Sequence, residues 1–345
     1  MRAMCIPSRL SFSAIATALV GFCMLISACD TGSDYEGRAI LIPGPPFEPC
    51  PDCETLVIDE HVVWNADEGP IVLDRDVNVL PEGSLEIRPG TVIVFEPDVV
   101  CMPGGDFNIW RSPMISVEGE LICRGSSDSL IVFEESPSCT NRETIVSDSA
   151  TSVLHMEYVV ARAVYSGPGE VTISRCTLSE LWIDGGKNHN VSLNDIESVR
   201  MRSSGAMLTY NEIRVLFAYG GRPIIDRNIF RGSAEDDCEA IRCGSGTQAE
   251  ITNNTFIDCA YCLAIHSASP TAHGNDFVSR GAAVLVWGET TPGVPDTLDF
   301  SGNWWGTTSV THVPRRIVYR RTNLVWPLTY LEYRPYAHAP FAAGG

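Results

Sequence analysis

Asparagine recurs at one place in a repeating pattern through the second half of the chain. Each copy is a triplet in which asparagine is followed by any residue and then by an apolar one. The triplets begin at Asn194, Asn211, Asn228, Asn254, Asn275 and Asn303, and Cys176 opens the same frame. From Cys176 onward they lie 18, 17, 17, 26, 21 and 28 residues apart, so insertions extend a short repeat in three places. Such a pattern predicts a solenoid of stacked coils.

An apolar residue stands three positions before each of these asparagines, and short stretches alternate apolar and polar residues. Alternation at period two is typical of strands with one buried face. Coils stacked at the inter-strand distance of about 4.8 Å would let the asparagine amides hydrogen-bond along the stack while the apolar residues form one core. A leucine-rich horseshoe needs a fixed leucine frame, and a propeller needs longer repeats. The sequence therefore predicts an all-β solenoid with irregular inserted loops.

Motifs at both ends of the repeats resemble those of a known family. Residues 79–91 read Val-Leu-Pro-Glu-Gly-Ser-Leu-Glu-Ile-Arg-Pro-Gly-Thr, and residues 302–306 read Gly-Asn-Trp-Trp-Gly. With the asparagine column, they resemble the right-handed parallel β-helix proteins of the pectate-lyase-like superfamily, over about residues 58–340. The resemblance implies a right-handed parallel β-helix over residues 55–310, followed by a C-terminal cap and tail over 311–345. It implies no single activity, because this fold carries lyases, hydrolases, epimerases and non-catalytic modules.

The N-terminus has the features of an export signal. Arg2 and Arg9 precede an apolar run that ends in Ile-Ser-Ala-Cys at residues 26–29, which resembles the lipobox of bacterial lipoproteins. Residues 1–28 are then a signal peptide, Cys29 carries the lipid, and the proline-rich residues 29–54 form a tether. The alternative is a single membrane-spanning anchor. We expect a lipid-anchored protein of the bacterial cell envelope, either periplasmic or on the cell surface.

Charge and cysteine content agree with export. The formal charge is −19, which disfavours nucleic acid as a partner. Removing the signal peptide and lipidating Cys29 leaves ten of the thirteen cysteines, an even number suited to disulfides. Zinc or redox sites are the alternative for the two Cys-x-x-Cys pairs. The disulfide candidates are Cys50, Cys53, Cys238, Cys243, Cys259 and Cys262, and we expect cross-coil bridges from Cys238 to Cys259 or from Cys243 to Cys262.

Two enzymatic interpretations centre on residues 235–242. Asp236 and Asp237 resemble the paired catalytic aspartates of polygalacturonase-type hydrolases, but the other motifs of those enzymes do not occur here. A polysaccharide lyase would need a cation and a base. Calcium would be bound by Glu235, Asp236, Asp237 and Glu239, with Arg242 close by. Adjacent acids in an exposed loop are otherwise simply solvated.

The repeat frame also predicts which side chains face outward on stacked strands. This surface would carry aromatic residues interleaved with cations: Trp182, Arg200, Arg202, Phe217, Tyr219, Arg242, His266 and Trp287. Aromatic faces stack on sugar rings and arginine forks match carboxylates, so an acidic polysaccharide fits, although aromatic residues also favour strands for packing alone. We therefore predict a non-catalytic glycan-binding or structural module that requires no cofactor, with a divergent lyase or hydrolase as the alternative.

Overall fold

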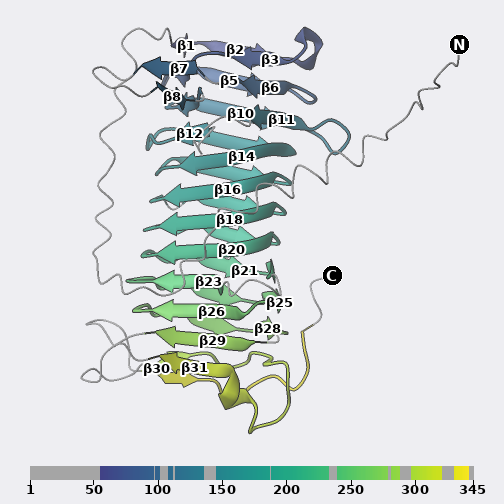
Figure 1. The fold of residues 1–345 in the computed structure, drawn as a ribbon, viewed down its shortest axis with the longest axis vertical. Coiled ribbons are helices and arrows are strands. Elements are labelled where there is room, and N and C mark those ends of the chain that lie inside the picture. The colour runs from purple at the N-terminus through teal and green to yellow at the C-terminus, as the bar shows by residue number, and fades with distance from the viewer. Residues whose placement is uncertain are drawn as a thin grey trace, which may run out of the picture. The chain divides into compact units, whose positions relative to one another are not determined.

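Parallel strands stack one coil above the next along the body of the chain (Figure 1). The computed structural model describes residues 55–341 except 97, 102–107, 112, 136–144, 187, 233–238, 279–280, 288–296 and 321–329. All of them belong to one unit, Glu48–Gly345. The predicted signal peptide, the lipidation site Cys29 and the tether lie outside the described residues. Within the described ranges, no helix has the length and apolar character needed to cross a membrane.

Two parallel sheets form the wall of this body, and their strands alternate along the chain. The larger sheet comprises β1 (Leu56–Ile58), β3 (Ile71–Leu73), β4 (Val77–Val79), β6 (Val92–Phe95), β9 (Ile115–Val117), β11 (Ile131–Glu135), β12 (Ile145–Ser147), β14 (Val159–Ser166), β16 (Thr177–Asp184), β18 (Asp195–Arg202), β20 (Glu212–Tyr219), β22 (Ile229–Arg231), β23 (Glu239–Gly244), β25 (Thr255–Ile257), β26 (Tyr261–His266), β28 (Asp276–Phe277), β29 (Ala282–Trp287) and β31 (Ile317–Arg320).

The second sheet comprises β2 (His61–Trp64), β5 (Ser84–Ile87), β10 (Glu120–Arg124), β13 (Val153–Glu157), β15 (Glu170–Ser174), β17 (His189–Ser192), β19 (Met207–Thr209), β21 (Ile224–Asp226), β24 (Glu250–Thr252) and β27 (Thr271–His273). The remaining elements are an antiparallel pair, β7 (Asp98–Cys101) with β8 (Asn108–Arg111), a parallel pair, β30 (Thr297–Asp299) with β32 (Tyr330–Glu332), and two 3-10 helices, η1 (Ala66–Glu68) and η2 (Val313–Arg316).

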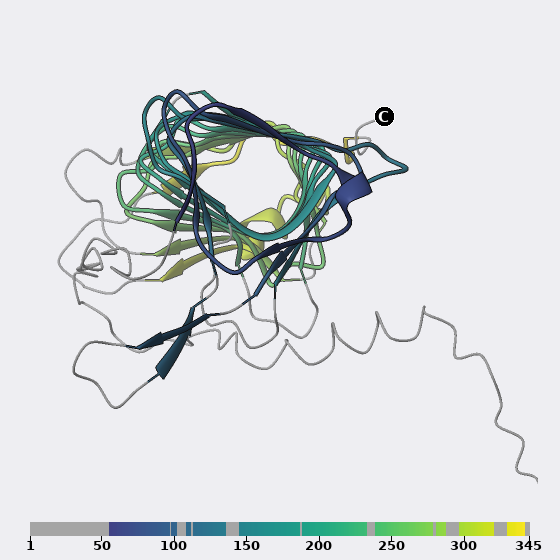
Figure 2. The same ribbon diagram turned by 90° about the horizontal axis from the view of Figure 1, so that it is seen from above.

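Each coil contains one strand of the second sheet and then one or two strands of the larger sheet, so that the coils seen end-on outline a ring (Figure 2). In the middle coils the larger sheet uses one long strand per coil, from β14 to β20. We call the first three residues of such a strand its leading part and the last five its trailing part. In later coils the two parts are separate strands: β22 pairs with the leading part of β20, and β23 pairs with the trailing part. The predicted parallel β-helix is confirmed.

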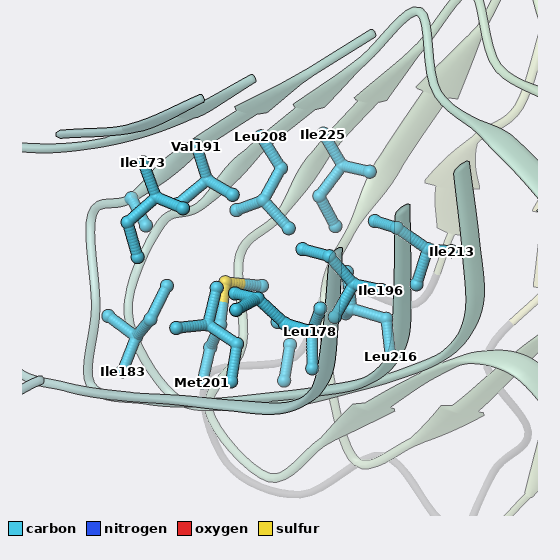
Figure 3. Close-up of a cluster of buried hydrophobic side chains, with 14 of the residues drawn as sticks. Ile173, Leu178, Ile183, Val191, Ile196, Met201, Leu208, Ile213, Leu216 and Ile225 are labelled. Carbon is cyan, nitrogen blue, oxygen red and sulfur yellow. The ribbon is translucent and has the colours of Figure 1, made fainter. Parts of the chain in front are cut away.

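Apolar side chains from both sheets fill the interior of the ring. Ile173, Val191, Leu208 and Ile225 point inward from successive strands of the second sheet and face residues of the larger sheet such as Ile196 (Figure 3). In the later coils a stack of aromatic rings continues the core. The ring centroids of Phe230 and Phe256 are 5.0 Å apart, and those of Phe256 and Phe277 are 5.2 Å apart. Since each coil buries its apolar side against its neighbours, the core is continuous along the axis.

The repeated asparagines lie one above another at the turn between the two sheets. The Nδ2 atom of Asn194 donates to Oδ1 of Asn211 at 2.9 Å, and Asn211 donates to Asn228 in the same way. The series continues through Asn254, Asn275 and Asn303. Each of these Oδ1 atoms also accepts a backbone N–H from the preceding coil. The column therefore satisfies buried polar groups that the turn would otherwise leave without partners.

The last coils are closed by an aromatic residue and an arginine. The fully buried Trp305 stacks on Phe277, with ring centroids 5.0 Å apart. Arg316 in η2 donates to the carbonyl oxygens of Phe277 and Trp305 at 3.1 and 2.8 Å. Beyond residue 310, β31 adds one further rung by pairing with β29. These contacts cover the end of the hydrophobic core.

Candidate functional site

Outward-facing residues in the trailing parts of the long strands form a column, because neighbouring coils pair in register. Trp182 pairs with Arg200 on the next coil, Arg200 with Phe217, and Phe217 with Arg242. We call these four residues the ladder. Aromatic and cationic side chains alternate along it, one to each coil. The structure thus brings four of the sequence-predicted ligand-binding residues together.

The arginines of the ladder lie over the aromatic rings. The guanidinium carbon of Arg200 is 4.7 Å from the ring centroid of Trp182 and 5.5 Å from that of Phe217. Arg242 lies 5.5 Å from the Phe217 centroid, on the coil at the other side. Because each ring attracts a cation to its face, the aromatic residues hold the guanidinium groups in place. Because the arginines cover part of the Trp182 and Phe217 rings, these rings offer less area for stacking on a sugar than the sequence analysis predicted.

Arg200 differs from its neighbours in its charge environment. The side chain is exposed, and among the described residues it has no ion-pair partner. Trp182 is anchored beside it, since its Nε1 donates to Glu180 at 3.1 Å. A guanidinium that rests on rings in this way keeps its N–H donors available for an external anion.

Glu239 links Arg242 to His266. The Nε atom of Arg242 donates to Glu239, and Nε2 of His266 lies 3.9 Å from the same carboxylate. Burial would lower the pKa of Arg242, but the hydrogen bond and the charge of Glu239 outweigh burial and raise it. Burial would likewise raise the pKa of Glu239, but its contacts with His266 and Arg242 lower it. Glu239 therefore stabilises the protonated form of Arg242, which suits a cation that binds an anion.

Arg202 and Tyr219 form a second outward column beside the ladder. They are paired across β18 and β20, and Arg202 Nε lies 3.6 Å from Asp184. Tyr219 leans toward the next coil, where a Cβ atom on Gly244 would overlap its ring. The charge of Arg202 is thus partly offset, while Tyr219 remains exposed.

His266 and Trp287 continue the second outward column, because Tyr219 pairs with Gly244 and the register of the next coil places His266 beside Gly244. Their ring centroids are 5.0 Å apart, and the guanidinium of Arg320 lies 5.2 Å from the Trp287 ring. On these coils Ala264 and Leu285 occupy the ladder position, and both are buried. The predicted residues therefore lie on two adjacent columns, and Arg320 is a further member of the second column that the sequence analysis missed. Arg320 belongs to this column because β31 pairs in register with β29, which places it beside Trp287.

A groove of about 580 Å³ runs beside the asparagine column, and the sequence analysis did not identify it. Leu193, Tyr210 and Arg227 are among its lining residues, and each stands directly before a column asparagine. Their φ angles of 60°, 56° and 54° lie in the left-handed region, which non-glycine residues rarely adopt. These lining positions share no residue type, so the sequence carried no signal for the groove.

A family model described as a right handed beta helix region matches residues 123–304. The match covers more than half of the chain. The chain belongs to the right-handed β-helix family. No curated protein and no solved structure is significantly similar to it.

Membership of the β-helix family does not specify an activity, so each candidate site has to be judged from its own residues. Asp236, Asp237 and Glu235 lie outside the described residues. Glu239, the fourth predicted calcium ligand, is occupied by Arg242 and His266. Across the described ranges, no three His, Cys, Asp or Glu side chains are grouped so that they could hold a metal ion.

The register of this β-helix corrects one predicted disulfide. Cys243 pairs with Ile265 across the coils, three residues away from Cys262, and Cys243 forms no disulfide. The bridge from Cys243 to Cys262 is therefore wrong, because the register of β23 and β26 places Cys262 beside Ala240 and not beside Cys243. Cys50, Cys53 and Cys238 lie outside the described residues.

Cys259 and Cys262 contact each other within one coil. A hydrogen bond between the two thiols lowers the pKa of Cys259. Burial instead raises the pKa of Cys243 to about 12. The thiol of Cys243 is thus held in its unreactive protonated form.

Proposed function

We propose that this β-helix protein is a non-catalytic module that binds an acidic polysaccharide through the ladder. One observation carries the proposal: the Arg200 guanidinium rests on Trp182 and Phe217 without an ion-pair partner among the described residues. Charge-assisted, two-pronged contacts are the way in which arginine recognises carboxylates. Because the rings already restrict the guanidinium, less conformational entropy is lost when a ligand binds.

The surroundings of the ladder support binding over catalysis. Glu239 stabilises the protonated form of Arg242 by raising its pKa, which favours a binding role over that of a base. The overall charge of −19 repels polyanions, so attraction has to come from local contacts. We therefore expect binding of moderate strength that depends on a few arginines.

The proposed location follows from the N-terminal sequence. A lipid on Cys29 would hold the module at a membrane of the bacterial cell envelope, with residues 29–54 as the tether. Metabolic labelling with a lipid precursor tests this step, with Cys29→Ala as the control. An unlabelled wild-type protein would remove the lipid anchor and leave the binding proposal standing.

Affinity electrophoresis through gels that contain acidic or neutral polysaccharides tests the binding proposal. Arg200→Ala should reduce retention by an acidic polysaccharide about tenfold or more, since hydrogen bonds to charged groups contribute about 1.5–3 kcal/mol. Arg200→Lys keeps the charge but loses the planar fork of donors. Its retention should therefore lie between that of the wild type and that of Arg200→Ala.

Arg124→Ala is the matched control. Arg124 is an exposed arginine at the end of β10, in the second sheet, and its removal changes the net charge by the same amount. Its retention should equal that of the wild type. Equal retention of the wild type and Arg200→Ala would exclude the ladder as the binding surface. If the polysaccharide acquires new reducing or unsaturated ends during incubation with the protein, the protein is an enzyme.

A further inference from the structure

The spacing of charge along the ladder limits which acidic polysaccharide fits. Arg200 and Arg242 are separated by one coil, and the residue at that position is Phe217. The two arginines are thus two coil spacings apart, roughly 10 Å at about 4.8 Å per strand. A pyranose in an extended polysaccharide advances by a distance close to one coil, so a chain lying along the ladder places about one sugar over each coil.

From this spacing we infer that the ladder selects polysaccharides in which charged and uncharged sugars alternate. The inference rests on the proposed function of the ladder and goes on to specify its ligand. A uronate carboxylate meets the Arg200 fork, the next sugar lies over Phe217, and the following carboxylate meets Arg242. Trp182 extends the same alternation by one further uncharged position on the other side.

Phe217 discriminates against a carboxylate at the middle position. Its ring has a guanidinium at 5.5 Å on each side, and it offers no hydrogen-bond donor to a bound anion. A carboxylate there would lose part of its hydration without gaining a direct partner, which is unfavourable. A polymer with a carboxylate on every sugar therefore binds with a mismatch at each second coil.

The two arginine positions are unequal. Glu239 neutralises part of the Arg242 charge, whereas Arg200 has no carboxylate partner among the described residues. Arg242 is still accessible, with a side chain that is 40% exposed, while the side chain of Glu239 is only 10% exposed. Its Nη atoms carry further donors beyond the Nε used by Glu239. We therefore expect Arg200 to contribute more to affinity than Arg242.

Competition between defined polysaccharides tests the inference on the full-length protein. The probes are a glucuronate–N-acetylglucosamine copolymer, polygalacturonate of matched length and a neutral glucan. The copolymer should bind about tenfold more tightly than polygalacturonate, which is about 1.4 kcal/mol. The neutral glucan should bind weakest. Among oligosaccharides, affinity should rise sharply when a trisaccharide with uronates at both ends replaces a disaccharide, since three coils connect the two arginines.

A substitution at the middle position should reverse the preference. Phe217→Arg places forks on three consecutive coils and should favour polygalacturonate over the copolymer. Phe217→Leu keeps an apolar residue there and should retain the preference for the copolymer, although the arginines lose one ring. Circular dichroism and urea unfolding confirm that each variant is folded.

The outcomes separate the two proposals. Equal affinity of the wild type for the copolymer and polygalacturonate would overturn the alternation and leave acidic-glycan binding intact. No binding to either acidic polymer would overturn both. An unchanged preference in Phe217→Arg would show that Phe217 does not set the selectivity.

Discussion

Two columns of side chains run along this β-helix at the same spacing, one inside the wall and one outside it. In the interior column, asparagine repeats on each coil from Asn194 to Asn303, and each amide bonds to the next. In the ladder, aromatic residues and arginines alternate on half-exposed positions. A missing amide inside leaves buried donors unsatisfied, while water can solvate whatever the ladder leaves unpaired. The interior column is therefore held to one residue type, and the exterior is free to vary for binding.

The strongest test of this difference is to remove one phenylalanine from the core and one from the ladder. Phe256→Ala opens a cavity between Phe230 and Phe277 and should lower the free energy of unfolding by about 3–5 kcal/mol. Phe217→Ala in the ladder removes a half-exposed ring and should lower it by no more than about 1 kcal/mol. Urea unfolding measures both, and equal losses would show that the ladder is part of the core.

A substitution in the asparagine column comes next in size. Asn211→Ala removes the acceptor of both the backbone N–H and the side-chain amide of Asn194. Two buried donors at about 1–3 kcal/mol each make the expected loss of stability at least about 2 kcal/mol. The control is Asn190→Ala, because Asn190 is exposed on β17 and should change stability by less than about 0.5 kcal/mol. Similar losses for the two variants would remove the special role of the column.

The interior could be predicted from the sequence because burial imposes a repeat. The asparagine frame and the apolar positions before it determine the register, and the outward positions of Trp182, Arg200 and Phe217 follow from alternation along each strand. Even after the insertion, the frame placed Arg242, Ala264 and Leu285 correctly on one column.

The contacts of the outer surface could not be predicted in the same way. Glu239 accepts a hydrogen bond from Arg242, three residues later in β23. This contact depends on where β23 begins after the insertion, which the repeat pattern does not specify. The burial of Ala264 and Leu285 likewise breaks the outer surface where the repeat alone predicts exposed positions. The left-handed residues before the column asparagines have no common residue type, so the pattern of side chains does not reveal them.

The ion pair between Glu239 and Arg242 joins a mostly buried carboxylate to a partly exposed guanidinium. Its contribution to stability can be measured by changing the pH. The pKa of Glu239 is lowered in the folded protein. Its contribution to stability is therefore complete above its unfolded pKa of about 4.3 and is lost as the pH falls through the lower folded value. Glu239→Gln removes this contribution.

Urea unfolding of the wild type and Glu239→Gln as a function of pH measures the effect. We expect a difference of about 1.5 kcal/mol above pH ~5, at the lower limit for hydrogen bonds to charged groups, and a smaller difference below pH ~4. Glu250→Gln is the control, because Glu250 is exposed on β24. A difference that grows toward acid pH would show that the sign of the interaction is wrong.

The smallest effect on stability should come from the residue with the largest effect on binding. Arg200→Ala removes an exposed guanidinium from two rings, and cation–π contacts at exposed sites contribute about 0.5–1 kcal/mol. Its free energy of unfolding should thus fall by about 1 kcal/mol or less, while retention by an acidic polysaccharide falls about tenfold. Measuring both quantities on the same preparation separates the two roles. A loss of several kcal/mol in the free energy of unfolding would mean that Arg200 mainly covers Trp182 and Phe217. A loss of retention with little change in stability would mean that Arg200 serves ligand binding and not folding.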